Sequence, residues 1–152
     1  MTLSRRSAIG LFALAPVASL ITRPAFAAEP ETFQIDGIAI RGFDPVGYFT
    51  DGGPVMGSAE FTTDHNGATW KFANAANRDA FIGDPGKYGA RYGGYCAYAA
   101  AKGGLAKTVP EAWTIYEDRL YLNFSVTVRG IWSEDIPGNI IKADANWPGI
   151  LG

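Results

Sequence analysis

The sequence predicts a small single domain of the α+β class, built from antiparallel β-hairpins and short helices. Three pairs of segments with alternating apolar and polar residues flank short polar turns, within residues 33–40, 60–72 and 113–123. Between and after these pairs lie segments with helical spacing of apolar residues and suitable capping residues. No segment has the pattern of a parallel βαβ unit, so we expect the strands to pair antiparallel.

Residues 1–27 are predicted to be an export signal that is removed. Arg5 and Arg6 precede an apolar run at residues 8–21, and residues 25–27 have the small-x-small pattern that signal peptidase accepts. The run is 14 residues long, shorter than the about 20 needed to span a bilayer, so we expect no membrane anchor after cleavage. The arginine pair favours twin-arginine export to the periplasm. An ordinary secretory signal with a chance arginine pair is the alternative.

The remaining residues 28–152 have the length of one domain. The signal carries three of the 13 basic residues and none of the 15 acidic ones, so the mature domain has a formal net charge of −5. An acidic domain without a cluster of Lys and Arg is a poor candidate for binding nucleic acid or an anionic membrane surface. We therefore expect a soluble periplasmic domain.

The first hairpin is predicted around Asp36-Gly37, a dipeptide typical of two-residue turns. After it, Asp44 can cap a short helical turn at residues 46–49, with Pro45 in the first helical position. Residues 51–54 combine Asp, Gly and Pro and indicate a loop that ends this turn.

The second hairpin is predicted across a turn at residues 64–67. Asn74 can then cap a helix that ends near residues 83–85, with three apolar residues directed inward: Ala76, Ala80 and Phe81. The tyrosines that follow recur at helical spacing, and an alanine-rich helix is expected from about Gly94 to Gly103.

The third hairpin is predicted across residues 117–119. Ser125 can cap a helix that runs through Trp132, and a last helix is expected at residues 137–145. We expect the isoleucines of this last segment to face the core, namely Ile136, Ile140 and Ile141. Trp147 is expected to fold back on the core.

An ordered set of short motifs in this chain resembles the YHS domain family. In chain order they are RGFDPVGYF at residues 41–49, WKFAN at 70–74, NR at 77–78, Phe81, DP at 84–85, Tyr88, YGGYCA at 92–97 and NWP at 146–148. The resemblance runs from about Ile38 to Pro148, and the chain is similar to a longer, exported branch of that family.

The resemblance implies a fold related to small zinc-binding, treble-clef-like modules, and metal binding through cysteines. Shorter YHS modules accompany copper-transporting ATPases and some oxygenases. The positions of this chain that correspond to the family's cysteines are Gly47, Ala73 and Asn77, and none of them supplies a thiolate. The resemblance therefore implies the fold, whereas this chain departs from the family's metal site.

Cys96 is the only cysteine and the first candidate for chemistry. A closed zinc site needs four ligands, usually Cys and His, and this chain has one of each, so zinc is not expected. Copper(I) accepts soft donors at low coordination number, and the available donors are Cys96, His65 and Met56. The alternatives are a buried structural thiol and an intermolecular or redox-active one.

The remaining candidates each have a structural alternative. His65 lies in the predicted second turn and is expected to be a solvated loop residue unless it binds a metal. Asp44, Tyr48 and Tyr95 are candidates for a ligand pocket, although helix capping explains Asp44 and core packing explains the tyrosines equally well.

The first functional hypothesis is a soluble periplasmic metal-binding protein, with copper as the favoured ion, in a carrier, buffering or sensing role. The second is a non-catalytic accessory or interaction domain that contacts a periplasmic partner protein and contains a structural cysteine. A thiol-dependent enzyme with a Cys96–His65 pair is third. No sequence motif of a nucleophile elbow, zinc protease, phosphate loop or dinucleotide site is present.

Overall fold

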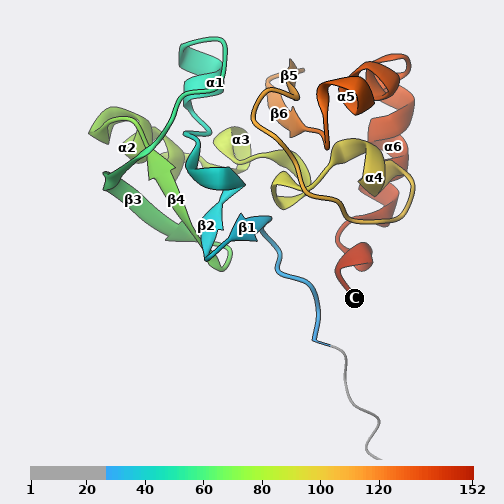
Figure 1. Ribbon diagram of the computed structural model, residues 1–152, viewed down its shortest axis with the longest axis horizontal. Coiled ribbons are helices and arrows are strands. Elements are labelled where there is room, and N and C mark those ends of the chain that lie inside the picture. The colour runs from blue at the N-terminus through green and yellow to red at the C-terminus, as the bar shows by residue number, and fades with distance from the viewer. Residues whose placement is uncertain (1–26) are drawn as a thin grey trace, which may run out of the picture.

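The structure is a computed structural model that describes residues 27–152 (Figure 1). The predicted export signal, apart from Ala27, lies outside the described residues. The described chain is an α+β fold with two mostly antiparallel sheets and short helices, as the sequence predicts. In Figure 1 the larger sheet lies on one side, and the C-terminal helices lie beside the smaller sheet on the other.

The larger sheet contains four strands in the order β1-β2-β4-β3. Their bounds are β1 Gln34–Ile35, β2 Ile38–Ala39, β3 Ser58–His65 and β4 Ala68–Phe72. The first and second predicted hairpins are confirmed, with β1 antiparallel to β2 and β3 antiparallel to β4. Both hairpins have two-residue turns with positive φ at both residues, for example 47° at Asn66 and 78° at Gly67. Such turns match the twist of the flanking strands.

One strand pair is parallel, which corrects the expectation of antiparallel pairing throughout. Ile38 of β2 lies opposite Thr69 of β4, and the Thr69 amide donates a hydrogen bond to the Gly37 carbonyl at 2.8 Å. The chain between β2 and β4 contains the 3₁₀ turn Ile40–Gly42, helix α1 (Gly47–Thr50) and strand β3. Because this connection is long, it can bring β4 back beside β2 in the same direction.

Helices α2 (Ala75–Gly83) and α3 (Pro85–Tyr88) follow the larger sheet. The predicted cap of α2 is confirmed, since Asn74 Oδ1 accepts the Asn77 amide at 2.8 Å. Phe81 is buried, but the expectation that Ala76 faces inward is wrong, because Ala76 is exposed and Asn77 lies on the inner side of the helix.

The remaining elements are the 3₁₀ segment η2 (Arg91–Gly94), α4 (Ala97–Ala101), β5 (Trp113–Tyr116), β6 (Arg119–Leu122), α5 (Val126–Ser133), α6 (Ile136–Asn146) and η3 (Gly149–Leu151). The third predicted hairpin is confirmed as β5–β6, and Ser125 caps α5 by accepting the Val128 amide at 3.1 Å. On α6, Ile136 and Ile140 pack on the core as expected. The expectation for Ile141 is wrong, because its side chain is 71% exposed.

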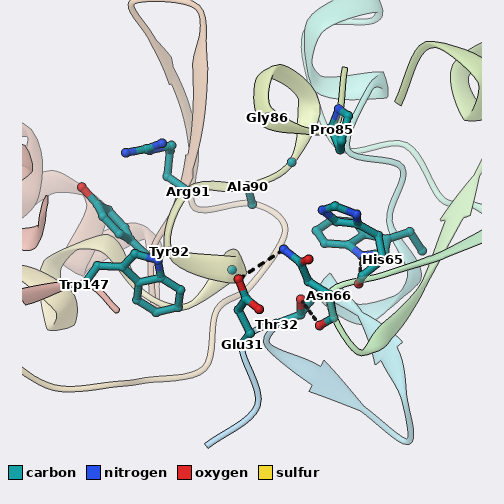
Figure 2. Close-up of a pocket in the computed structure, with 13 residues that line it drawn as sticks. Glu31, Thr32, His65, Asn66, Pro85, Gly86, Ala90, Arg91, Tyr92 and Trp147 are labelled. Atoms are coloured by element: carbon teal, nitrogen blue, oxygen red, sulfur yellow. Dashed lines mark hydrogen bonds between the residues drawn. The ribbon is translucent and has the colours of Figure 1, made fainter. Parts of the chain in front are cut away.

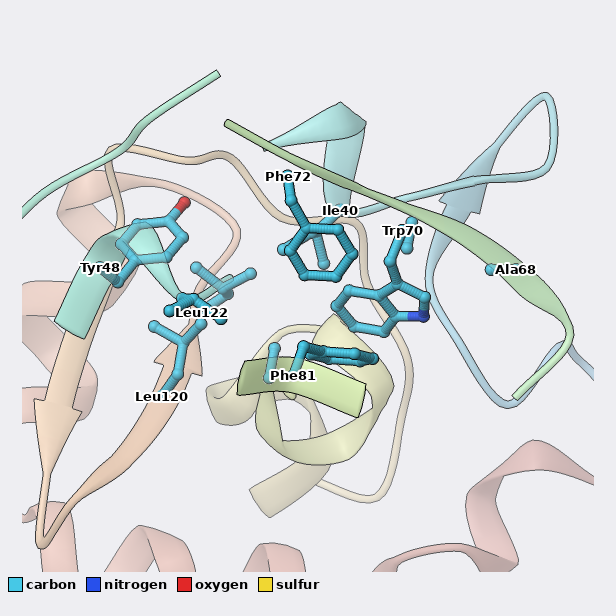
Figure 3. Packing of buried hydrophobic residues seen from close by; sticks show 11 residues of the cluster. Ile40, Tyr48, Ala68, Trp70, Phe72, Phe81, Leu120 and Leu122 are labelled. Atoms are coloured by element: carbon cyan, nitrogen blue, oxygen red, sulfur yellow. The ribbon is translucent and has the colours of Figure 1, made fainter. Parts of the chain in front are cut away.

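Two apolar clusters form the core, and β6 contributes to both. Leu120 and Leu122 pack in the first cluster with Tyr48, Trp70, Phe72 and Phe81 (Figure 3). Tyr121, between them, packs in the second cluster with Trp132 and the alanines of α4. Successive side chains of a strand point to opposite faces, so one short strand joins the two clusters. Within residues 27–152, no helix has the length and apolar character that crossing a membrane requires.

Candidate functional site

Cys96 is the N-cap of α4, and its side chain is only 1% exposed. Its sulfur accepts the Phe124 amide at 3.3 Å and the Ala99 amide at 3.5 Å. The thiol donates to Asn123 Oδ1 at 3.5 Å. The sulfur is therefore enclosed by backbone donors and one amide oxygen, which is the environment of a structural thiol.

The three predicted metal donors have different surroundings. Met56 is 62% exposed beside the larger sheet, where it forms an isolated bridge with Phe43. His65 packs edge-on against Phe81, with ring centroids 5.4 Å apart, and Cys96 is buried at the start of α4. In the part of the chain that the structure describes, no three His, Cys, Asp or Glu side chains gather as a metal site would require.

His65 differs from the solvated turn residue that we expected. It is the last residue of β3, because the second turn contains only Asn66 and Gly67. Its side chain is half-buried. Its main-chain carbonyl accepts a hydrogen bond from the Trp70 indole at 3.1 Å. The imidazole is thus held in place by the adjacent aromatic side chains of the first cluster.

Asp44 is fully buried and accepts four hydrogen bonds from three segments. Its Oδ1 accepts the amides of Val46 at 2.8 Å and Gly47 at 3.2 Å. Its Oδ2 accepts the Ala73 amide at 2.8 Å and the Asn77 side-chain amide at 2.7 Å. The carboxylate therefore holds the turn before α1 and connects it to the end of β4 and to α2. The expectation that Asp44 caps the helix is wrong, because α1 begins one residue later than predicted and its N-cap is Val46, which makes no side-chain cap.

Tyr48 and Tyr95 are also anchored by backbone contacts. The Tyr48 hydroxyl donates to the Pro110 carbonyl at 3.3 Å, and the Tyr95 hydroxyl donates to the Pro30 carbonyl at 2.8 Å. Burial raises the pKa of both phenols, with a further contribution from Glu111 at Tyr48 and Glu29 at Tyr95. Both hydroxyls therefore stay protonated and act as structural donors at neutral pH.

The structure contains a cleft of about 310 Å³ that sequence reasoning did not identify. Its walls come from residues 31–32, the end of β3 with its turn, Trp70 of β4, the start of α3, residues 89–93, and Trp147. Figure 2 shows His65 and Asn66 on one side and Tyr92 and Trp147 on the other, with Glu31 between them in this view. Of the predicted site residues, only His65 lines this cleft.

One wall of the cleft is an extended segment, residues 29–33, which we call the strap. The Glu29 amide donates to the Leu151 carbonyl at 2.7 Å, and the Phe33 amide donates to the Gly93 carbonyl at 2.9 Å. Toward the larger sheet, the Thr32 hydroxyl donates to the Asn66 carbonyl at 3.0 Å. The strap therefore connects the C-terminal part of the fold to the second hairpin.

The wall next to the strap depends on unusual backbone geometry in η2. Tyr92 and Gly93 both have positive φ, at 57° and 63°. A Cβ at Gly93 would collide with the main-chain carbonyl of Glu31 in the strap. Glycine is therefore required at residue 93 both by conformation and by the close approach of the strap.

The charged groups around the cleft are not equally compensated. Arg91 Nη2 lies 3.4 Å from Asp144 Oδ1, and the guanidinium lies 5.7 Å from the centre of the Tyr92 ring. The Tyr92 hydroxyl donates to the same carboxylate at 2.9 Å, and burial together with Asp144 raises the pKa of that phenol. Glu31 instead accepts one long hydrogen bond of 3.4 Å, from the neutral Asn66 amide.

Cys96 is not among the lining residues, so the cleft does not bring His65 and the thiol together as the third hypothesis requires. The residues that sequence reasoning missed are Glu31 and Arg91, together with the placement of Trp147 at the cleft. The glycine pair at residues 93–94 was a usable signal for close backbone approach, whereas nothing local marked Glu31.

No family model, no curated protein and no solved structure matches this chain.

Proposed function

We propose that this chain is an exported, non-catalytic accessory domain of the YHS type that binds a small molecule in the cleft beside the strap. The observation that carries the proposal is the cleft itself: about 310 Å³, with three aromatic residues, an imidazole, a guanidinium and a carboxylate among its walls. Concave sites of this size with a few polar groups are the usual form of small-molecule sites.

The surroundings of Asp44 support the YHS assignment. The positions that the resemblance equates with the family's cysteines are Gly47, Ala73 and Asn77, and all three contribute a hydrogen bond to the Asp44 carboxylate. These three positions, which come from distant segments, therefore lie around one point, as the resemblance implies for the family's metal site. In this chain a buried carboxylate connects them, so we propose a fold that needs no metal.

The enclosed sulfur supports a structural role for Cys96. Its two amide donors and its own donation to Asn123 leave it engaged within the fold. The copper-carrier hypothesis gains no geometric support, because its three donors lie in different surroundings. It remains a prediction that a direct titration tests.

Two titrations of purified residues 28–152 test the proposal. A library of small polar and aromatic compounds is titrated while tryptophan fluorescence is followed, and we expect ligands whose binding is lost in Trp147→Leu. A Cu(I) titration with a competing chelator is run in parallel on the wild type and on Cys96→Ser. We expect no stoichiometric uptake in either. One equivalent of Cu(I) bound only by the wild type would reinstate the copper hypothesis, and a library without any hit would contradict the proposed function.

A further inference from the structure

We infer that the ligand of the cleft is a small organic ammonium ion, held by the Glu31 carboxylate and by the ring of Trp147. This inference rests on the proposed function and specifies its ligand class. It depends on three features of the cleft: the sign of its uncompensated charge, its aromatic walls, and its size.

The uncompensated charge in the cleft is negative. Two ionised side chains contribute to its walls, Glu31 and Arg91. Arg91 already pairs with Asp144, which lies outside the lining. Within residues 27–152, the structure records no salt bridge for Glu31, whose one hydrogen bond comes from a neutral amide. The Glu31, Arg91 and Asp144 side chains together carry a formal net charge of −1, so a cation entering the cleft finds an available carboxylate. The buried Nε of Arg91 has no hydrogen-bond partner within residues 27–152, and an anion would have to compete with Asp144 for this guanidinium.

Aromatic rings line the cleft together with the carboxylate. Trp147 is half-buried, and its ring centre lies 6.0 Å from that of Tyr92 and 6.3 Å from that of Tyr95. Those contacts fix the orientation of the indole. In Figure 2 the Glu31 side chain lies between Trp147 on one side and His65 on the other. An ammonium group beside an indole face is attracted by the ring quadrupole, and alkyl groups on the nitrogen add apolar contact.

The size of the cleft favours an organic ion over a bare metal ion. At roughly 30 Å³ per water molecule, a space of about 310 Å³ corresponds to about ten waters. Four of the lining residues have small side chains or none, namely Gly86, Gly89, Ala90 and Gly93. A metal ion would have one carboxylate and one imidazole among the lining side chains and no third acidic or sulfur ligand. A choline-sized ion fits within this space beside Glu31 and leaves room for water.

The test compares a cation with its uncharged isostere. Choline and 3,3-dimethylbutan-1-ol have nearly the same shape, but only choline carries a charge. Both are titrated into purified residues 28–152 at low ionic strength, by calorimetry and by tryptophan fluorescence. We expect choline to bind about fivefold more tightly than the alcohol, since an exposed carboxylate contributes up to about that factor and the indole face adds to it.

Two variants that each remove one negative charge show whether Glu31 is responsible for the preference for choline. Glu31→Gln keeps the side-chain shape and should reduce choline affinity by about fivefold, while affinity for the alcohol is unchanged. Glu29→Gln removes the same charge from the same strap, but Glu29 does not line the cleft, so choline affinity should stay within about twofold. Thermal unfolding followed by circular dichroism checks that both variants keep the fold.

The outcomes separate this inference from the proposed function. Equal affinity for choline and the alcohol, or an unchanged choline affinity in Glu31→Gln, would overturn the ammonium inference. A neutral or anionic compound from the library that binds and loses binding in Trp147→Leu would overturn it too, while leaving the cleft as a small-molecule site. If no compound of any charge binds, the proposed function fails together with it.

Discussion

Asp44 is the residue on which several segments of the fold depend. Its carboxylate accepts hydrogen bonds from the turn before α1, from the end of β4 and from the inner face of α2, and it is fully buried. Buried charged acceptors are stable when every oxygen has donors, and removal of the acceptor leaves those donors unsatisfied.

We therefore expect Asp44→Ala to destabilise the protein by about 3 kcal/mol or more. The two backbone donors at Val46 and Ala73 would lose their partner in a site closed to water. Urea unfolding followed by circular dichroism measures the change. Asp51→Ala is the matched control, because Asp51 is exposed just after α1. Equal effects of the two substitutions would contradict the role assigned to Asp44.

Cys96 gives a second prediction at this scale. Because its sulfur caps α4, serine should replace it with a loss of no more than about 1 kcal/mol, whereas alanine should cost about 1–2 kcal/mol more than serine. Urea unfolding of the two variants measures this difference. In the native wild type, a maleimide should label the thiol only after denaturant is added. Rapid labelling of the folded protein would show that the sulfur is accessible and would argue against the structural role.

At the scale of elements, the strap and η2 form the cleft together. The strap is held by the Phe33 amide on the Gly93 carbonyl and by the Tyr95 hydroxyl on the Pro30 carbonyl. Neither segment has regular secondary structure that could form alone. Each is ordered by the other, so the cleft depends on their contact.

Gly93→Ala should disrupt that contact. The added methyl group would meet the strap's carbonyl at Glu31, and alanine is strained at a φ of 63°. We expect a loss of about 2 kcal/mol in stability and faster hydrogen exchange of the strap amides. Gly130→Ala in α5 is the control, since nothing lies within 4 Å of its added methyl, and it should be neutral or stabilising by up to about 1 kcal/mol. Strap amides that exchange as slowly in Gly93→Ala as in the wild type would refute this account.

For the whole molecule, two apolar clusters joined by β6 and a satisfied buried carboxylate form the core. A domain of this size can bury enough apolar surface to fold without a metal. We expect the midpoint of thermal unfolding to be the same before and after exhaustive treatment with a chelator. A drop of several degrees on chelation would indicate a structural ion and would contradict the metal-free fold.

Local signals in the sequence predicted most of the elements. The Asp36-Gly37 and Asn66-Gly67 turns, and the Asn74 and Ser125 caps, each depend on residues that are neighbours in the chain, and the structure confirms them. The predictions were wrong where contacts between distant segments determine strand pairing or side-chain exposure. The parallel pairing of β2 with β4 is one example, and the exposed side chains of Ala76 and Ile141 are others.

The sequence alone determined the fold class, the three hairpins and the acidic composition, from which we expect no nucleic-acid partner. Only the tertiary structure decided that Cys96 is enclosed, that Asp44 joins three segments, and that Glu31, His65 and Trp147 line one cleft. The physical reason is the separation along the chain over which each interaction acts. Turns and caps are set by steric and hydrogen-bonding preferences over a few residues, whereas burial, charge compensation and cavity shape depend on side chains that only folding brings together.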